Sequence, residues 1–225
     1  MIIIDNSKMK LVILYNDGTL DKEITKCSPH HTHDVTLVDD STVDVFTAAD
    51  MHIINIDTKQ TERVIKAAGR CYGITYHKGT LLWCEGTRGL NKMELSDDSI
   101  ITLVEDAMLP DQSFVTTFGD KIFQTNLVNN SVTCYTINGE KLWEFRDESV
   151  LRTPIAVAVD NNCNIYVTSY NYNKVIVLSP DGKQWRQLLD QNDGMSCPYG
   201  ISIDKTTNNI LITNYYGSAF LYHIS

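Results

Sequence analysis

The chain has 225 residues, of which 43% are hydrophobic and 21% are charged, as in an ordinary globular protein. Its formal net charge of −9 argues against general nucleic-acid binding, because proteins that grip phosphates usually carry an excess of Lys and Arg. No stretch approaches the roughly 20 apolar residues of a membrane span, and Asp5 ends the short apolar run at the N-terminus. Neither a membrane span nor a signal peptide is therefore expected.

In chain order, the predicted elements form six groups of short β-strands. Residues 1–27 contain three strands, the last of which follows the Asn16-Asp17-Gly18 turn. Four groups of four strands follow, at about 28–68, 69–108, 109–151 and 152–194, and residues 195–225 contain three further strands. The first group lacks its inner strand, so Met1 is expected to fall inside a repeat, and the last group lacks its outer strand.

The groups repeat one pattern. Prolines 29, 110, 154 and 198 open four of them, and Cys71 takes the place of proline in another, which gives a period of 39 to 44 residues. Alternating apolar strands follow within each period, and an Asn-Gly or Asp-Gly turn leads to the fourth strand at 138–139 and 181–182. Four strands in about 40–45 residues are typical of a β-propeller blade. We predict one all-β domain over 1–225, a six-bladed β-propeller with an incomplete N-terminal blade; the alternative is five blades, with the two ends sharing one.

A family resemblance is specific in the C-terminal third. The segment Pro154 to Asp160, followed by Asn164 to Thr168, Lys174 to Leu178 and Asp181-Gly182, resembles an NHL repeat, and residues 198–222 resemble another. The whole chain is similar in style to the C-terminal NHL domains of tripartite-motif (TRIM) proteins. The resemblance implies a propeller that selects a protein or RNA partner, while a separate RING domain carries ubiquitin transfer.

Candidate binding residues lie in loops that join blades or join the second and third strands of a blade. Tyrosine suits such interfaces because it offers a large apolar body and a hydroxyl at low entropic cost. Arginine offers planar donor forks for a carboxylate or phosphate. The candidates are Tyr170, Asn171, Tyr172, Tyr199, Tyr215, Tyr216, Arg70, Arg88 and Arg152. The alternative is that the tyrosines cover blade edges and the arginines pair with local acids.

Other polar clusters have structural interpretations. His30, His31 and His33 share one loop, and His31 and His33 are the candidates for a zinc site, but their spacing fits no standard zinc pattern and no metal is expected. Asp39, Asp160 and Asp204 end inner strands and are expected to form turns rather than a ring of ligands. Tryptophans 83, 143 and 185 are expected to pack between blades.

The sequence therefore predicts a recognition module rather than an enzyme. It contains no GxSxG, P-loop, dinucleotide or HExxH pattern and no paired Cys/His zinc spacing. The favoured function is substrate or partner selection for a TRIM–NHL ubiquitin ligase, in the cytoplasm because no CxxC pair occurs among the six cysteines. Two alternatives stay open, RNA binding and a metal-dependent lactonase or lyase. No cofactor, membrane contact or small-molecule substrate is expected.

Overall fold

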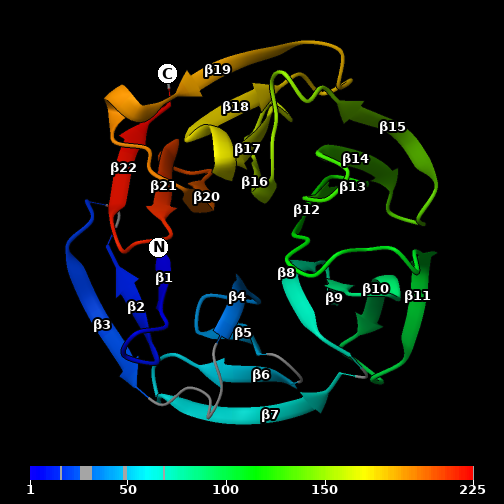
Figure 1. Ribbon diagram of the computed structural model, residues 1–225. Coiled ribbons are helices and arrows are strands. Elements are labelled where there is room, and N and C mark those ends of the chain that lie inside the picture. Colours follow the sequence, from blue (N-terminus) through cyan, green and yellow to red (C-terminus); the bar gives the residue numbers. More distant parts are fainter. Residues whose placement is uncertain (16, 26–31, 48–49, 68, 225) are drawn as a thin grey trace. The chain divides into compact units, whose positions relative to one another are not determined.

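The computed structural model describes residues 1–15, 17–25, 32–47, 50–67 and 69–224. These residues form six antiparallel sheets and two single-turn 3₁₀ helices, and they contain no α-helix. The chain divides into two compact units, Met1–Gln112 and Ser113–Ser225. Figure 1 shows three sheets in each unit. The six predicted blades are confirmed, because each sheet falls within one of the six predicted groups.

Unit 1 contains the first three blades, and the strands of each blade pair in chain order. Its strands are β1 (Ile2–Asp5), β2 (Lys10–Leu14) and β3 (Leu20–Thr25); β4 (Thr32–Leu37), β5 (Thr42–Thr47), β6 (Asp50–Asn55) and β7 (Gln60–Lys66); and β8 (Cys71–His77), β9 (Thr80–Glu85), β10 (Gly89–Glu94) and β11 (Ile100–Glu105).

Unit 2 contains the other three blades in the same order. Its strands are β12 (Val115–Phe118), β13 (Lys121–Asn126), β14 (Ser131–Thr136) and β15 (Lys141–Arg146); β16 (Pro154–Val159), β17 (Ile165–Ser169), β18 (Lys174–Leu178) and β19 (Trp185–Leu189); and β20 (Pro198–Asp204), β21 (Asn209–Asn214) and β22 (Ala219–His223). The helical turns are η1 (Tyr170–Tyr172) and η2 (Gln191–Asp193).

The first and last blades have three strands each. The Asp17-Gly18 turn joins β2 to β3 as Asp181-Gly182 joins β18 to β19, so β1 to β3 correspond to the second, third and fourth strands of a complete blade. The first blade therefore lacks its inner strand, as predicted. The two three-stranded sheets are separate sheets, and the five-bladed alternative is wrong.

Neighbouring blades within a unit cover each other's faces. In unit 1 one cluster of buried side chains joins the first and second blades and another joins the second and third. In unit 2 two further clusters join the fourth blade to the fifth and the fifth to the sixth. A single four-stranded blade cannot bury both faces alone, so this packing supplies the hydrophobic stabilisation of each unit.

A repeated contact shapes the start of the inner strands. In the fifth and sixth blades the inner strand carries a bulge after its proline. The hydroxyl of Thr168 accepts from the amide of Ala156 at 2.9 Å, and that of Thr213 accepts from Gly200 at 3.2 Å. These hydroxyls occupy the donors that the bulge leaves unpaired. The bulge fixes where the preceding inter-blade loop leaves the sheet.

The recurring aspartates are turn formers, as predicted. Oδ1 of Asp39 accepts from the amide of Ser41, that of Asp160 from Asn162, and that of Asp204 from Thr206, at 2.8 to 2.9 Å. Each carboxylate thereby bonds the backbone two residues on, which holds the turn between the first and second strands.

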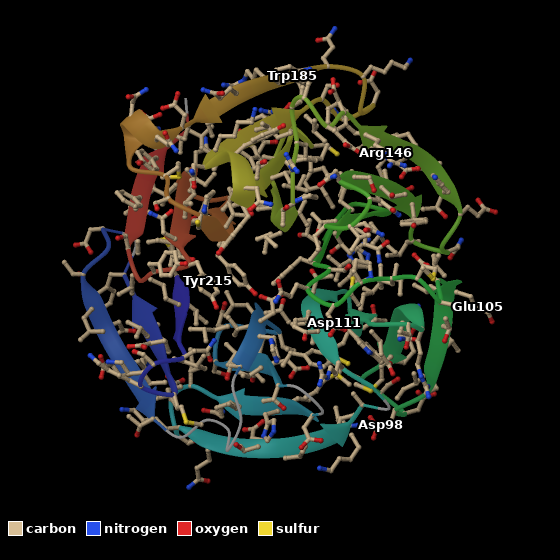
Figure 2. The ribbon with its side chains drawn as sticks, viewed as in Figure 1. Asp98, Glu105, Asp111, Arg146, Trp185 and Tyr215 are labelled. Atoms are coloured by element: carbon tan, nitrogen blue, oxygen red, sulfur yellow. The ribbon has the colours of Figure 1, made fainter. Side chains whose placement is uncertain are left out.

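The tryptophans behave differently from one another. Trp83 is fully buried between the second and third blades, and Trp143 packs on the fifth blade, where its indole donates to the carbonyl of Pro180 at 3.3 Å. Trp185 corrects the prediction, because its side chain is exposed on the outer strand β19 (Figure 2). An outer strand has an open face, so apolar residues on it need not find a partner blade.

Among the described residues, no helix is long and apolar enough to cross a membrane. The cysteines at 71, 84, 134, 163 and 197 are free thiols.

Candidate partner-binding surface

Four predicted tyrosines converge in unit 2. Tyr170 follows β17, Tyr199 lies near the start of β20, and Tyr215 and Tyr216 follow β21. The ring centroid of Tyr215 lies 6.0 Å from Tyr170, 5.4 Å from Tyr199 and 5.2 Å from Tyr216. Phe114 completes the group at 6.0 Å from Tyr199. We call these five residues the tyrosine cluster, and Tyr215 is the member labelled in Figure 2.

The rings meet largely edge to face. The planes of Tyr170 and Tyr215 cross at 82°, and those of Tyr215 and Tyr216 at 88°. Edge-to-face contacts are favourable because the positive ring edge meets the negative ring face. Mutual packing therefore holds the side chains in place before any partner arrives.

The outer rings of the cluster are open to solvent. Tyr215 is 58% exposed and Tyr216 is 77% exposed, whereas Tyr170 is half-buried. Burial, followed by a hydrogen bond with Cys197, raises the pKa of Tyr170 to about 12. That hydroxyl stays protonated near neutral pH, so Tyr170 contributes no charge to the cluster.

Polar residues at the ends of the second strands hold the loops beneath the cluster. The side chain of Asn214 accepts from the amide of Ser196 at 3.1 Å and donates to the carbonyl of Gly194 at 3.0 Å. The hydroxyl of Ser169 bonds both the amide and the carbonyl of Arg152, each at 3.0 Å. The repeat pattern shows these polar residues, but sequence alone does not reveal that they fasten one loop to the next.

The other residues of the η1 turn face the preceding inter-blade loop. The Asn171 side chain donates to the hydroxyl of Thr153 at 2.6 Å, and the Tyr172 hydroxyl donates to the carbonyl of Glu148 at 2.8 Å. The Lys174 ammonium lies 4.9 Å from the centre of the Tyr172 ring. Asn171 and Tyr172 are exposed, but these contacts fasten the loop rather than extend the tyrosine cluster.

The three candidate arginines differ in their unit and in their ion pairs. Arg152 is exposed in unit 2, and its guanidinium forms no ion pair with the residues that the structure describes. Arg70 and Arg88 belong to unit 1, where Arg70 faces Asp111 at 3.4 Å and Arg88 faces Glu85 at 3.3 Å. Arg70 and Arg88 therefore each face a local carboxylate, and a contact of either with a partner stays a prediction.

The candidate histidines fall only partly within the described residues. His31 lies outside the described residues, as does His30. His33 packs its ring against Tyr72, with centroids 4.4 Å apart. No group of three or more metal-ligating His, Cys, Asp or Glu side chains occurs within the described part of the chain.

Comparison with known proteins identifies the architecture. No protein-family profile matches the chain, and no curated protein sequence matches it. Solved structures do. A virginiamycin B lyase from Staphylococcus aureus is 16% identical, with a TM-score of 0.70 over 100% of this chain and 80% of its own. A chain of a nidogen–laminin complex is 12% identical, with a TM-score of 0.73 over 99% of this chain and 92% of its own.

The chain has a β-propeller fold. A protein of unknown function from Bacteroides thetaiotaomicron shares it at 11% identity, with a TM-score of 0.77 over 98% of this chain and 65% of its own. Identities this low show the fold alone, since one fold carries many functions. The finer resemblance to TRIM–NHL domains stays a prediction.

Proposed function

We propose that this propeller is a protein-recognition module and that the tyrosine cluster is its contact surface. The observation that carries the proposal is the exposure of Tyr215 and Tyr216 on a cluster that is already packed. Exposed aromatic groups on soluble proteins mark interaction sites, and tyrosine is enriched among the residues that dominate binding energy. Rings that are held before binding lose little conformational entropy on contact.

The finer proposal is substrate selection for a TRIM–NHL type ubiquitin ligase in the cytoplasm. The NHL-like pattern of residues 154–182 and 198–222 supports it. In this proposal the chain binds and does not catalyse, and transfer of ubiquitin would require a RING domain elsewhere.

Affinity capture tests the recognition proposal. The double variant Tyr215→Ala/Tyr216→Ala removes the two most exposed rings of the cluster. We expect the proteins captured from cell lysate by the wild-type chain to survive ribonuclease and to bind the variant at least tenfold more weakly, since losing a central aromatic contact costs about 2 kcal/mol or more. Binding of each purified partner is then measured by calorimetry.

Tyr15→Ala is the matched control, because Tyr15 is 56% exposed but lies outside the cluster, in unit 1. Unfolding curves establish that all variants fold. Full partner affinity in the double variant would show that the cluster is not the contact surface. If ribonuclease abolishes capture, the partner is RNA rather than protein. Arg152 and Lys174 are then the candidate phosphate contacts beside the aromatic rings.

A lyase is the second candidate, and the fold similarity to virginiamycin B lyase favours it. Incubation of the chain with virginiamycin B and divalent cations, followed by mass spectrometry, tests this candidate. A product that accumulates in proportion to the amount of chain supports a lyase. An unchanged antibiotic under conditions in which the Staphylococcus aureus enzyme turns over contradicts it.

A further inference from the structure

The turn between β9 and β10 in the third blade holds an arginine against a buried carboxylate. The amide of Arg88 donates to the carbonyl of Glu85 at 3.0 Å. Thr87 has φ +66° and Gly89 has φ +112°, so the chain reverses within this segment. The turn fixes the backbone of Arg88 directly beside the end of β9.

Two neighbouring side chains of the third blade hold the Glu85 carboxylate in place. Its side chain is 3% exposed, and Oε2 accepts from the Asn91 amide at 3.0 Å and from the Trp83 indole at 3.4 Å. Asn91 is held in turn by the hydroxyl of Thr102, which donates to it at 2.8 Å. A buried carboxylate with two side-chain donors cannot readily rotate.

Oε1 of Glu85 points to the other side and faces Arg88. It is buried, accepts no aligned hydrogen bond from the residues that the structure describes and lies 3.3 Å from Nε of Arg88. Gly69 leaves room for it, since a Cβ at that position would lie 2.7 Å from Oε1. Arg88 is 58% exposed, and the structure shows no partner for its two terminal nitrogens within the described residues. The buried carboxylate thus orients the Nε edge of the guanidinium and leaves the terminal fork open to solvent.

Arg70 lies on a segment tied to the same turn. The amide of Gly86 donates to the carbonyl of Arg70 at 3.0 Å, and the amide of Thr87 donates to the carbonyl of Leu109 at 3.1 Å. Asp111, labelled in Figure 2, follows Leu109 by two residues in the chain and pairs with Arg70 at 3.4 Å. The pKa of Tyr72 is raised, first by burial and next by the charge of Asp111, which places this hydroxyl beside the same pair.

We propose that Arg88, with Arg70 as a second donor, forms an oxyanion-binding site at this end of the third blade. The ligand group is a carboxylate or a phosphate. A guanidinium binds either of them through two parallel N–H donors, and this fork loses less entropy when the guanidinium is already oriented. A cation is the poorer ligand, because Glu85 and Asp111 each already face an arginine.

Backbone amide shifts of residues 86–89 and the Nε–Hε signal of Arg88 test the site by NMR. Inorganic phosphate is titrated at constant ionic strength against sodium chloride, and sodium acetate is titrated in a second arm. We expect saturable shifts with a Kd on the order of 1–10 mM. Saturation by phosphate alone assigns a phosphate site, and saturation by both anions assigns a general oxyanion site.

Two variants separate an oriented guanidinium from simple charge. Arg88→Lys keeps the charge but loses the fork, and Glu85→Gln keeps Arg88 but loses the charge that orients it. We expect each variant to weaken phosphate binding about tenfold, the equivalent of one charged hydrogen bond. If Glu85→Gln does not fold, the exposed Arg88→Lys decides the question.

Arg146→Lys is the matched control, because Arg146 is 56% exposed and pairs with the exposed carboxylate of Glu148 at 3.5 Å (Figure 2). It should leave the shifts unchanged. Shifts that do not saturate, that chloride reproduces, or that Arg146→Lys weakens equally would overturn the proposal. The result is independent of the tyrosine cluster, since no cluster residue is changed.

Discussion

Asp44 is a carboxyl group in an environment that disfavours its charge. It lies on β5 with no exposed surface, and neither carboxyl oxygen accepts an aligned hydrogen bond from the described residues. Burial raises its pKa to about 7, and the nearby backbone amide of Val45 and then the charge of Arg63 lower it only in part. The pKa of Asp34 on β4 is also raised to about 7 by burial, against two amide donors that lower it.

These pKa values predict that stability falls as the pH rises through the range from about 4 to 7. A carboxyl whose folded pKa exceeds its unfolded pKa favours folding while it is protonated, and its ionisation in the folded state costs free energy. Asp44→Asn should therefore unfold at a higher temperature than the wild type at pH 8, by several degrees, and lose that advantage at pH 4. Thermal unfolding at both pH values measures the difference.

Asp40→Asn serves as control for this prediction, because Asp40 is exposed in the same unit. Parallel stability profiles for the wild type and Asp44→Asn would show that Asp44 does not titrate in this range. A residual slope in Asp44→Asn is expected from Asp34, and the double variant should remove it.

The aromatic loops supplied the candidate tyrosines, but the sequence did not show which of them meet. Tyr170, Tyr199, Tyr215 and Tyr216 lie in one cluster. Asn171 and Tyr172 sit beside Tyr170 in sequence but contact the 148–153 segment instead. A single turn of 3₁₀ helix sends successive side chains in different directions, and no local pattern shows which direction meets a neighbouring loop.

At the scale of elements, the turns decide how the strands meet. Gly89 opens β10 at φ +112°, where a Cβ would lie 2.0 Å from the carbonyl oxygen of Val104 and 2.7 Å from the amide of Asp106. These two atoms are backbone of the adjacent strand and its exit, and they cannot move aside without breaking the pairing of β10 and β11.

Gly89→Ala is therefore expected to destabilise the chain by more than about 2 kcal/mol, as a strained backbone conformation and a steric clash add together. Gly79→Ala is the matched control in the same blade, because Gly79 has φ +87° but nothing within 4 Å of its Cβ position. It should cost only about 1 kcal/mol from the backbone conformation. Urea unfolding compares the two, and equal losses would mean that the clash at Gly89 is relieved elsewhere.

The inner strands explain why the sequence repeat can be recognised although one blade has a cysteine in place of the proline. Pro154, Pro198 and Cys71 all begin an inner strand, and each of these strands has a bulge soon after it. Proline suits this position because it donates no ladder hydrogen bond. Cys71 keeps the place without the proline ring, since it is fully buried and fills the same position as a small apolar side chain.

At the scale of the whole molecule, charge bears on the choice between protein and RNA. The acidic excess is concentrated in residues 1–112, which carry 18 acidic and 11 basic side chains, whereas residues 113–225 carry 10 and 8. The tyrosine cluster thus lies in the less acidic unit. Without a basic excess in either unit, phosphate contacts cannot supply the main part of an affinity, which is why we expect captured partners to survive ribonuclease.

The sequence by itself determined the architecture. Period-2 strands and a period near 40 residues are local signals that recur from blade to blade, so single departures such as Cys71 do not hide them. The same pattern underlies a fold shared with proteins only 11% to 16% identical. Tertiary structure alone decided which side chains meet: the rings of the tyrosine cluster, the pairing of Arg88 with buried Glu85, the isolation of Asp44 and the exposure of Trp185. The rings of the cluster come from different strands and blades, and all of these features depend on bulges and loop paths that no local periodicity encodes.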